Sequence, residues 1–134
     1  MAEGKEVVAV MMVLGMLLVF SDMVDARTYV VGKADGSCSE KICWTFNVTD
    51  WPNHKTIFGG DVLVFNYNSS LHNVVYVDER AYKTCEVPKD PRYSRVYKTG
   101  HDRIQLPNLG LFRFISTMND DCKRGMRLSI LNLS

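Results

Sequence analysis

The sequence predicts an all-β domain, a sandwich or barrel built from short antiparallel strands. Short runs of β-branched and aromatic residues recur along the chain, and turn-forming residues separate each run from the next. Apolar residues at helical spacing are almost absent after residue 26. The length of 134 residues is enough for one domain of ordinary size. Together these observations favour a sandwich with at most one or two short helices.

Four of the expected strands lie in the first half of this domain. Residues 28–31 are β-branched or aromatic and end at Gly32, and residues 62–65 are continuously apolar after a turn at 59–61. Large apolar and polar residues alternate over 44–48, which predicts a half-buried strand that ends before Pro52. Residues 73–77 are rich in β-branched residues and are expected to form the fourth strand. The stretch 33–41 between the first two strands is polar and predicts a loop.

The second half begins with a predicted short helix over 78–83, where Asp78 supplies an acidic start. Two prolines within 88–93 predict a loop. The remaining expected strands are 96–97, 103–106, 109–115 and 126–133. The last of these alternates apolar and polar residues most regularly, as expected for a strand with one buried face.

The first 26 residues have the layout of a secretory signal peptide. Lys5 precedes 14 residues without a charge, and small or short side chains at Val24 and Ala26 suit a signal peptidase. A membrane-spanning helix needs about 20 apolar residues, and Asp22 interrupts the run too early for one. Residues 1–26 are therefore expected to be removed, which leaves a single secreted domain over 27–134.

Composition and charge restrict the classes of partner. Residues 27–134 contain 15 basic and 11 acidic side chains, a net charge of about +4. This mild excess favours an anionic polysaccharide or protein over a nucleic acid, which usually requires a stronger basic patch. The chain ends at Ser134 without a hydrophobic tail, so we expect neither a lipid anchor nor another membrane anchor. A monomer is the expected state.

The secreted domain contains four cysteines and three N-glycosylation sequons. The cysteines are Cys38, Cys43, Cys85 and Cys122, an even number that suggests two disulfides and allows three pairings. The sequons begin at Asn47, Asn68 and Asn132, and each is a glycosylation candidate if it is exposed.

Several segments, taken together, resemble the phytocyanin family, the plant blue-copper proteins, and are most similar to its plantacyanin (basic blue protein) branch. They occur in the family's order and cover most of the secreted domain: residues 44–53, 59–79, 82–85, 96–106 and 122–130. The resemblance implies a cupredoxin-like Greek-key β-sandwich. It also implies a disulfide between Cys85 and Cys122, which leaves Cys38 and Cys43 for a second bridge within the first loop.

The resemblance also implies where a blue-copper centre would lie. Such a centre uses two imidazoles, one thiolate and a weak axial ligand. His72 matches the first family ligand and Met126 matches the axial one. The family places a cysteine and a histidine five residues apart before the axial ligand, and these positions hold Ser116 and Asp121. Cys122 matches the disulfide cysteine and fixes this register without a gap.

These two replacements remove the chemistry of a blue-copper site. A serine hydroxyl is neutral and hard and does not replace a thiolate, and a carboxylate such as Asp121 favours harder ions. We therefore expect no cofactor, with a weak Cu(II) or Zn(II) site at His72 and Asp121 as a minor alternative. Without a metal, His72 is expected to be a partly exposed, hydrogen-bonded remnant, Met126 a core residue and Asp121 a solvated loop acid.

Two function hypotheses follow, and neither is enzymatic. Ser116 has no partner histidine and acid at a recognised spacing, and no phosphate-binding or metalloprotease motif is present. The first hypothesis is a non-redox binding or signalling protein of the plant cell wall or apoplast, with a glycan or an extracellular protein as its partner. The alternative is copper-dependent electron transfer, as in copper-binding phytocyanins, which the missing thiolate opposes.

Overall fold

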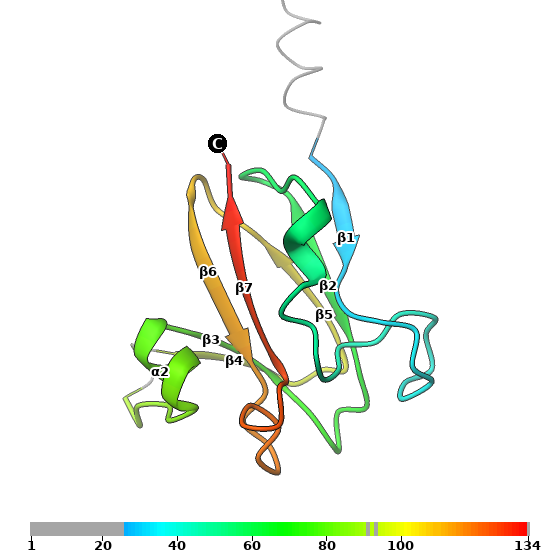
Figure 1. Ribbon diagram of the computed structural model, residues 1–134, viewed down its shortest axis with the longest axis vertical. Helices are drawn as coiled ribbons and strands as arrows, with labels where there is room; N and C mark the ends of the chain where they lie inside the picture. Colours follow the sequence, from blue (N-terminus) through cyan, green and yellow to red (C-terminus); the bar gives the residue numbers. More distant parts are fainter. Residues whose placement is uncertain (1–25, 91, 93, 134) are drawn as a thin grey trace, which may run out of the picture.

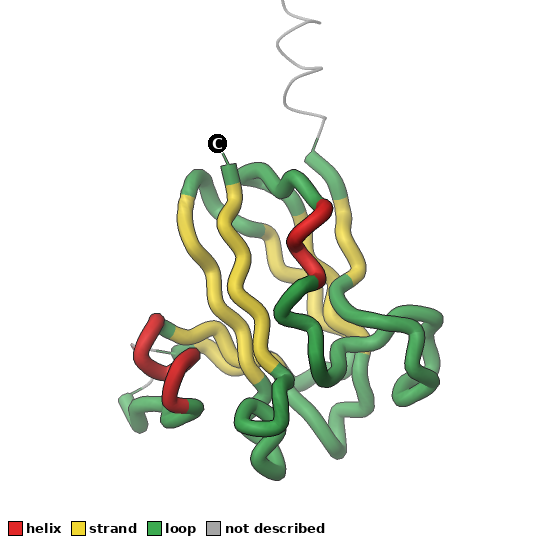
Figure 2. Tube along the Cα trace, in the orientation of Figure 1, coloured by secondary structure: helices red, strands yellow, loops and turns green. Residues whose placement is uncertain are grey.

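The computed structural model describes residues 26–90, 92 and 94–133, and these form a two-layered β-structure (Figures 1 and 2). Residues 1–25, which the sequence assigns to a signal peptide, lie outside the described residues. The strands are β1 (Thr28–Val30), β2 (Val62–Asn66), β3 (Val74–Val77), β4 (Arg95–Tyr97), β5 (His101–Gln105), β6 (Gly110–Ile115) and β7 (Arg127–Asn132). In the described part of the chain no helix is long and apolar enough to cross a membrane.

The strands form two sheets with different pairing. One sheet has the order β1-β2-β5, in which β1 runs parallel to β2 and β2 runs antiparallel to β5. The other has the order β4-β3-β6-β7 and is antiparallel throughout. Non-consecutive strands are neighbours in both sheets, so long connections cross between the layers. This arrangement confirms the predicted cupredoxin-like sandwich.

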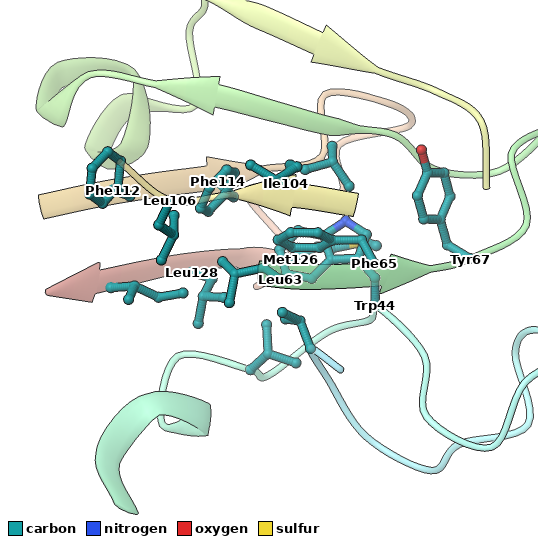
Figure 3. Packing of buried hydrophobic residues seen from close by; sticks show 14 of the residues in the cluster. Trp44, Leu63, Phe65, Tyr67, Ile104, Leu106, Phe112, Phe114, Met126 and Leu128 are labelled. Carbon is teal, nitrogen blue, oxygen red and sulfur yellow. The ribbon is translucent and has the colours of Figure 1, made fainter. Parts of the chain in front are cut away.

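The main hydrophobic core lies between the two sheets (Figure 3). Leu63 and Phe65 of β2 meet Phe114 of β6, and the Phe65 and Phe114 ring centroids are 5.2 Å apart. Trp44 is fully buried beside Phe65, and the two rings are nearly perpendicular with centroids 5.1 Å apart. The alternation of β7 buries Leu128 and Ile130 against the same core, as the sequence pattern predicts.

A second, smaller core lies on the outer face of the four-stranded sheet, beneath helix α2 (Glu79–Thr84). The helix begins because the Asp78 carboxylate accepts a hydrogen bond from the Ala81 amide at 2.9 Å. It ends at Cys85, whose φ of 60° is left-handed. Cys85 and Cys122 form a disulfide that ties the helix to the loop after β6. The predicted helix and this disulfide are both present.

The prediction of a strand over residues 44–48 is wrong. Trp44 and Val48 are fully buried, but Asn47 adopts a left-handed φ of 58°, which breaks an extended backbone. The Asn47 amide donates instead to the Gly125 carbonyl at 3.1 Å. A 3-10 helix, η1 (Trp51–His54), follows with a proline in its first turn. The alternating pattern therefore predicts neither the sheet pairing nor the burial here, since Thr45 is buried and Phe46 is only half-buried.

Two loops that follow strands of different sheets meet at one end of the sandwich. The loop between β2 and β3 and the loop between β6 and β7 lie at the lower end of Figure 1. The disulfide between Cys38 and Cys43 closes a third, polar loop after β1. Cys43 also pairs with Lys33 in an isolated bridge, which keeps this loop folded back on itself.

Candidate functional site

The four residues at the family's copper-ligand positions come together at this loop end. His72 closes the loop before β3, where its amide donates to the Asn68 carbonyl at 3.1 Å. Ser116 follows the last residue of β6, and Met126 precedes the first residue of β7. Asp121 lies in the loop between them. The loop before β3 and the connection between β6 and β7, which are distant in sequence, thus supply one site. The residues at this site are the ones that the resemblance implies.

Three of these side chains form a compact hydrogen-bond network centred on the Asp121 carboxylate. The Nδ1 atom of His72 lies 2.6 Å from Asp121 Oδ2, and the Ser116 hydroxyl donates to the same oxygen at 2.7 Å. The Ser116 Oγ also accepts a hydrogen bond from the Asn73 amide at 3.3 Å. We call His72, Ser116 and Asp121 the polar triad.

The polar triad is shielded from solvent. His72 is 9% exposed, Asp121 is 1% exposed and Ser116 is fully buried. The expectation that Asp121 is a solvated loop acid is therefore wrong, because its carboxylate satisfies two buried neighbours. His72 is hydrogen-bonded as expected, although little of it remains exposed. A buried carboxylate is stable only when such partners replace the lost water.

The backbone of the β6–β7 loop holds Asp121 in this position. The Met126 amide donates to the Asp121 carbonyl at 2.9 Å, and the Ser116 amide donates to the Met126 carbonyl at 3.1 Å. Asn119 and Asp120 both adopt left-handed φ angles, which turn the chain sharply before Asp121. Met126 is fully buried in the main core, as expected. The loop is thus closed at its base by its own peptide groups.

Neighbouring residues that the sequence analysis did not single out support the site. The Asn73 side chain exchanges two hydrogen bonds of 2.9 Å with Thr117, which join the start of β3 to the end of β6. The Phe46 ring meets the His72 ring edge-on with centroids 5.8 Å apart, and the Arg124 guanidinium lies 4.8 Å from the Phe46 centroid. Asn73 and Thr117 adjoin the predicted site residues His72 and Ser116 in the sequence, and this adjacency was the signal for them.

The residues at this site do not fit a blue-copper centre. All four cysteines of the chain are in disulfides, so no thiolate is available, and the site contains one histidine. When two donor atoms bind one tetrahedral metal ion, each at about 2.1 Å from the ion, the donor atoms are roughly 3.4 Å from each other. The 2.6 Å between His72 and Asp121 is instead a hydrogen-bond distance. Among the described residues, no three His, Cys, Asp or Glu side chains group as metal ligands.

The polar triad also differs from a nucleophilic catalytic triad. In a serine hydrolase the histidine accepts the serine proton, and the aspartate orients that histidine. Here the Ser116 hydroxyl donates to Asp121 rather than to His72. The carboxylate therefore stabilises both neighbours, and the described contacts lack the serine-to-histidine hydrogen bond that defines a catalytic triad.

The remaining predicted residues lie outside the polar triad. The structure contains both disulfides, Cys38–Cys43 and Cys85–Cys122, as the resemblance implies. Asn47 and Asn68 are exposed and remain glycosylation candidates. Asn132 is fully buried, and its side-chain amide donates to the Pro107 carbonyl at 2.8 Å. A glycan on Asn132 would be incompatible with this packing.

The protein has the two-sheet sandwich and the short helix of a cupredoxin. The loop between its last two strands lies where cupredoxins carry copper ligands. A family model described as a plastocyanin-like domain matches residues 44–126. The chain is 38% identical to a basic blue protein of Arabidopsis thaliana and 37% identical to a chemocyanin of Lilium longiflorum. Each of these alignments covers 97% of this chain and 98% of the relative.

A solved structure shows the same similarity. The chain superimposes on cucumber basic protein, a blue copper protein, with a TM-score of 0.66 and 38% identity, over 80% of this chain and 99% of that one. The chain therefore belongs to the phytocyanin family of the cupredoxin superfamily. Ser116 and Asp121 stand where the resemblance implies the cysteine and histidine ligands of that family.

Proposed function

We propose that this protein is a non-redox phytocyanin that acts as a secreted binding or signalling module of the plant cell wall or apoplast. Its sandwich serves as a rigid scaffold, and its surface binds a glycan or an extracellular protein. The observation that carries this proposal is the polar triad, in which Ser116 and Asp121 occupy the two ligand positions and satisfy each other.

Electron transfer by a blue-copper centre depends on a thiolate that binds copper strongly in both redox states. Ser116 supplies no thiolate, and its hydroxyl is already donated to Asp121 at 2.7 Å. A metal at this site would have to break the hydrogen bonds between Asp121 and its two neighbours. That cost opposes even a weak site that uses His72 and Asp121.

Three features support a secreted binding role. The first 26 residues have the layout of a signal peptide, and the domain contains two disulfides, which form in oxidising compartments. The net charge of residues 27–134 is about +4, which attracts anionic partners. Exposed Lys123 and Arg124 of the β6–β7 loop contribute to this positive charge.

The second candidate function is copper-dependent electron transfer. It is favoured by the kinship with cucumber basic protein, a blue copper protein, and by the presence of His72 and Met126 at two ligand positions. It would require a thiolate from a cysteine that the structure places in a disulfide.

The experiment that separates the two candidates is copper loading of the purified, processed protein. We expect no intense thiolate-to-copper absorption in the visible range and no copper retained after dialysis, because the polar triad offers no thiolate. A blue copper protein such as cucumber basic protein, treated identically, is the positive control. A strong visible band with one copper per chain would overturn the proposal and support electron transfer.

A further inference from the structure

The sandwich is open along one edge, where β4 and β5 are both outermost strands. A cavity of about 200 Å³ lies between them, and we call it the edge cleft. Its floor consists of the buried residues Ile104, Leu106 and Phe114. Residues exposed at its rim include Tyr76, Arg95 and Gln105, and Tyr97 and Phe112 complete the walls.

Two of the rim residues, Tyr76 and Arg95, are unusual because they occupy inward-facing positions. Arg95, Tyr76 and Phe114 lie directly opposite one another across β4, β3 and β6, so their side chains share one face of the sheet. Phe114 belongs to the main core, which identifies that face as the inner one. Inner faces of a sandwich are normally apolar and covered. Here the inner face carries an arginine, and Tyr76 is 38% exposed.

The edge cleft combines aromatic faces with a single unbalanced positive charge. The ring centroids of Tyr76 and Phe112 are 6.0 Å apart, and those of Tyr76 and Phe114 are 5.8 Å apart. The Arg95 guanidinium lies 5.8 Å from the Tyr97 ring centroid and pairs with no carboxylate in the described part of the chain. None of the described residues that line the cleft is acidic. An anionic ligand with an apolar ring face would complement this surface.

We propose that the edge cleft binds one uronate residue of an acidic glycan. Its volume lies below the roughly 300–1,000 Å³ of pockets for larger ligands, so it suits one sugar ring rather than a peptide segment. The C–H face of the sugar packs on the Tyr76 and Phe112 rings, and Arg95 binds the carboxylate. Because the cleft is open to solvent at the sheet edge, the polymer can continue on either side. This proposal rests on the proposed function and names a ligand class for it.

The test is titration of the ¹⁵N-labelled processed protein with a galacturonic acid trimer, followed by NMR. A neutral galactose trimer of the same linkage is the control ligand. We expect chemical-shift changes at Tyr76, Arg95 and Phe112 with the acidic trimer only. The variant Arg95→Gln should weaken binding by roughly tenfold, since a charged hydrogen bond is lost. Arg103→Gln removes the same charge from β5 outside the cleft and should leave the affinity unchanged.

Two results would overturn the uronate site. Shift changes absent from the edge cleft would exclude it, and equal weakening by Arg95→Gln and Arg103→Gln would indicate general charge attraction. A third pattern would also overturn it: the unaltered protein does not bind the trimer, and the Arg95→Gln variant self-associates. Arg95 would then protect the sheet edge from pairing with a second copy. The copper experiment is independent, so failure of the uronate site and failure of the non-redox proposal are distinguishable.

A different observation concerns the start of the secreted domain. The Arg27 amide donates to Asp61 Oδ1 at 2.8 Å, and the Phe58 amide donates to Asp61 Oδ2 at 2.8 Å. Asp61 is 2% exposed and has no cationic side-chain partner in the described part of the chain. A buried carboxylate without a counter-charge is costly.

We infer that cleavage after Ala26 supplies the missing charge. The new α-ammonium group of Arg27 would replace the amide that already points at Asp61, and a neutral contact would become a charge-assisted one. This contact also fixes the start of β1 beside β2, because the Val62 amide donates to the Arg27 carbonyl at 2.8 Å. Removal of the signal peptide would thus stabilise the first strand pair.

The test compares protein that begins at Arg27 with protein extended by Ala26, each with and without Asp61→Asn. We expect the Arg27 start to have the higher urea midpoint, and Asp61→Asn to remove the difference between the two starts. Equal midpoints for both starts with Asp61 intact would contradict the inference. Asp61→Asn distinguishes a contact of the new N-terminus with Asp61 from a non-specific effect of Ala26. A non-specific effect of Ala26 on the urea midpoint would persist in that variant.

Discussion

The loop between β6 and β7 contains residues that match the family pattern and residues that depart from it, and the two groups make different contacts. Cys122 and Met126 match the pattern and are buried in the small core and the main core. Ser116 and Asp121 depart from it and contact each other and His72. In this chain the residues that match the family pattern contribute to the two cores, whereas Ser116 and Asp121 belong to the polar triad, so we infer that the scaffold does not depend on metal ligands.

The largest expected effect tests the scaffold half of this comparison. The variant Cys85→Ala/Cys122→Ala removes a bridge that spans 37 residues, and loop-closure entropy gives a loss of about 4 kcal/mol in the free energy of unfolding. The matched variant Cys38→Ala/Cys43→Ala removes a bridge across five residues and should cost about 2 kcal/mol. Urea denaturation of both variants measures the difference. Equal losses would show that the chain-entropy account fails here.

The next effect tests the polar triad. Asp121→Asn weakens the acceptor that serves both His72 and Ser116 in a buried site, so we expect a loss of about 2 kcal/mol. Asp120→Asn changes the same charge at an exposed neighbour, and asparagine tolerates the left-handed backbone there, so its effect should stay within about 0.5 kcal/mol. Similar losses in both variants would mean that the polar triad contributes nothing specific to stability.

A smaller loss is expected at the position of the missing thiolate. Ser116→Ala removes one donor to Asp121 and leaves the Asn73 amide without its side-chain acceptor, at a cost of about 1 kcal/mol. Ser129→Ala on β7, where the serine side chain is half-buried, is the control and should be nearly neutral. Thermal unfolding of the two variants provides the comparison. An unchanged midpoint in Ser116→Ala would remove Ser116 from the account of the network.

The smallest effect on stability concerns the sequons. We expect N-linked glycan on the exposed Asn47 and Asn68 and none on Asn132, whose side chain is packed against Pro107. Mass spectrometry of glycopeptides from protein secreted by a plant host checks all three sites. Removal of the first two sequons by Thr49→Ala and Ser70→Ala keeps the left-handed Asn47 and should change stability by less than about 0.5 kcal/mol, since both altered side chains are exposed. A fully occupied Asn132 would contradict the buried position of its amide.

The sequence predicted most of the fold because strands with one buried face leave a clear pattern. Alternation over β7 and the apolar run of β2 placed those strands within one or two residues. The same reasoning failed at Trp44 to Val48, because the buried and exposed residues do not alternate there and Asn47 takes a left-handed turn. A positive φ at a residue other than glycine is set by its tertiary contacts, here the bond to Gly125.

The positions of the candidate site residues were predicted, but their interactions were not. Spacing from Cys122 identified Ser116 and Asp121, since the register needs no gap. The hydrogen bond between Asp121 and His72 joins residues 49 positions apart, and no local pattern records such a contact. The edge cleft was missed for the same reason, because it depends on where two sheets separate.

We infer that two side chains, Ser116 and Asp121, are sufficient to separate this protein from a blue-copper protein. The test is the double variant Ser116→Cys/Asp121→His, loaded with Cu(II) beside the unaltered protein, with a free-thiol count to confirm both native disulfides. We predict an intense visible thiolate-to-copper band in the variant and none in the unaltered protein. A band in the unaltered protein, or a correctly folded variant that stays colourless, would contradict the claim.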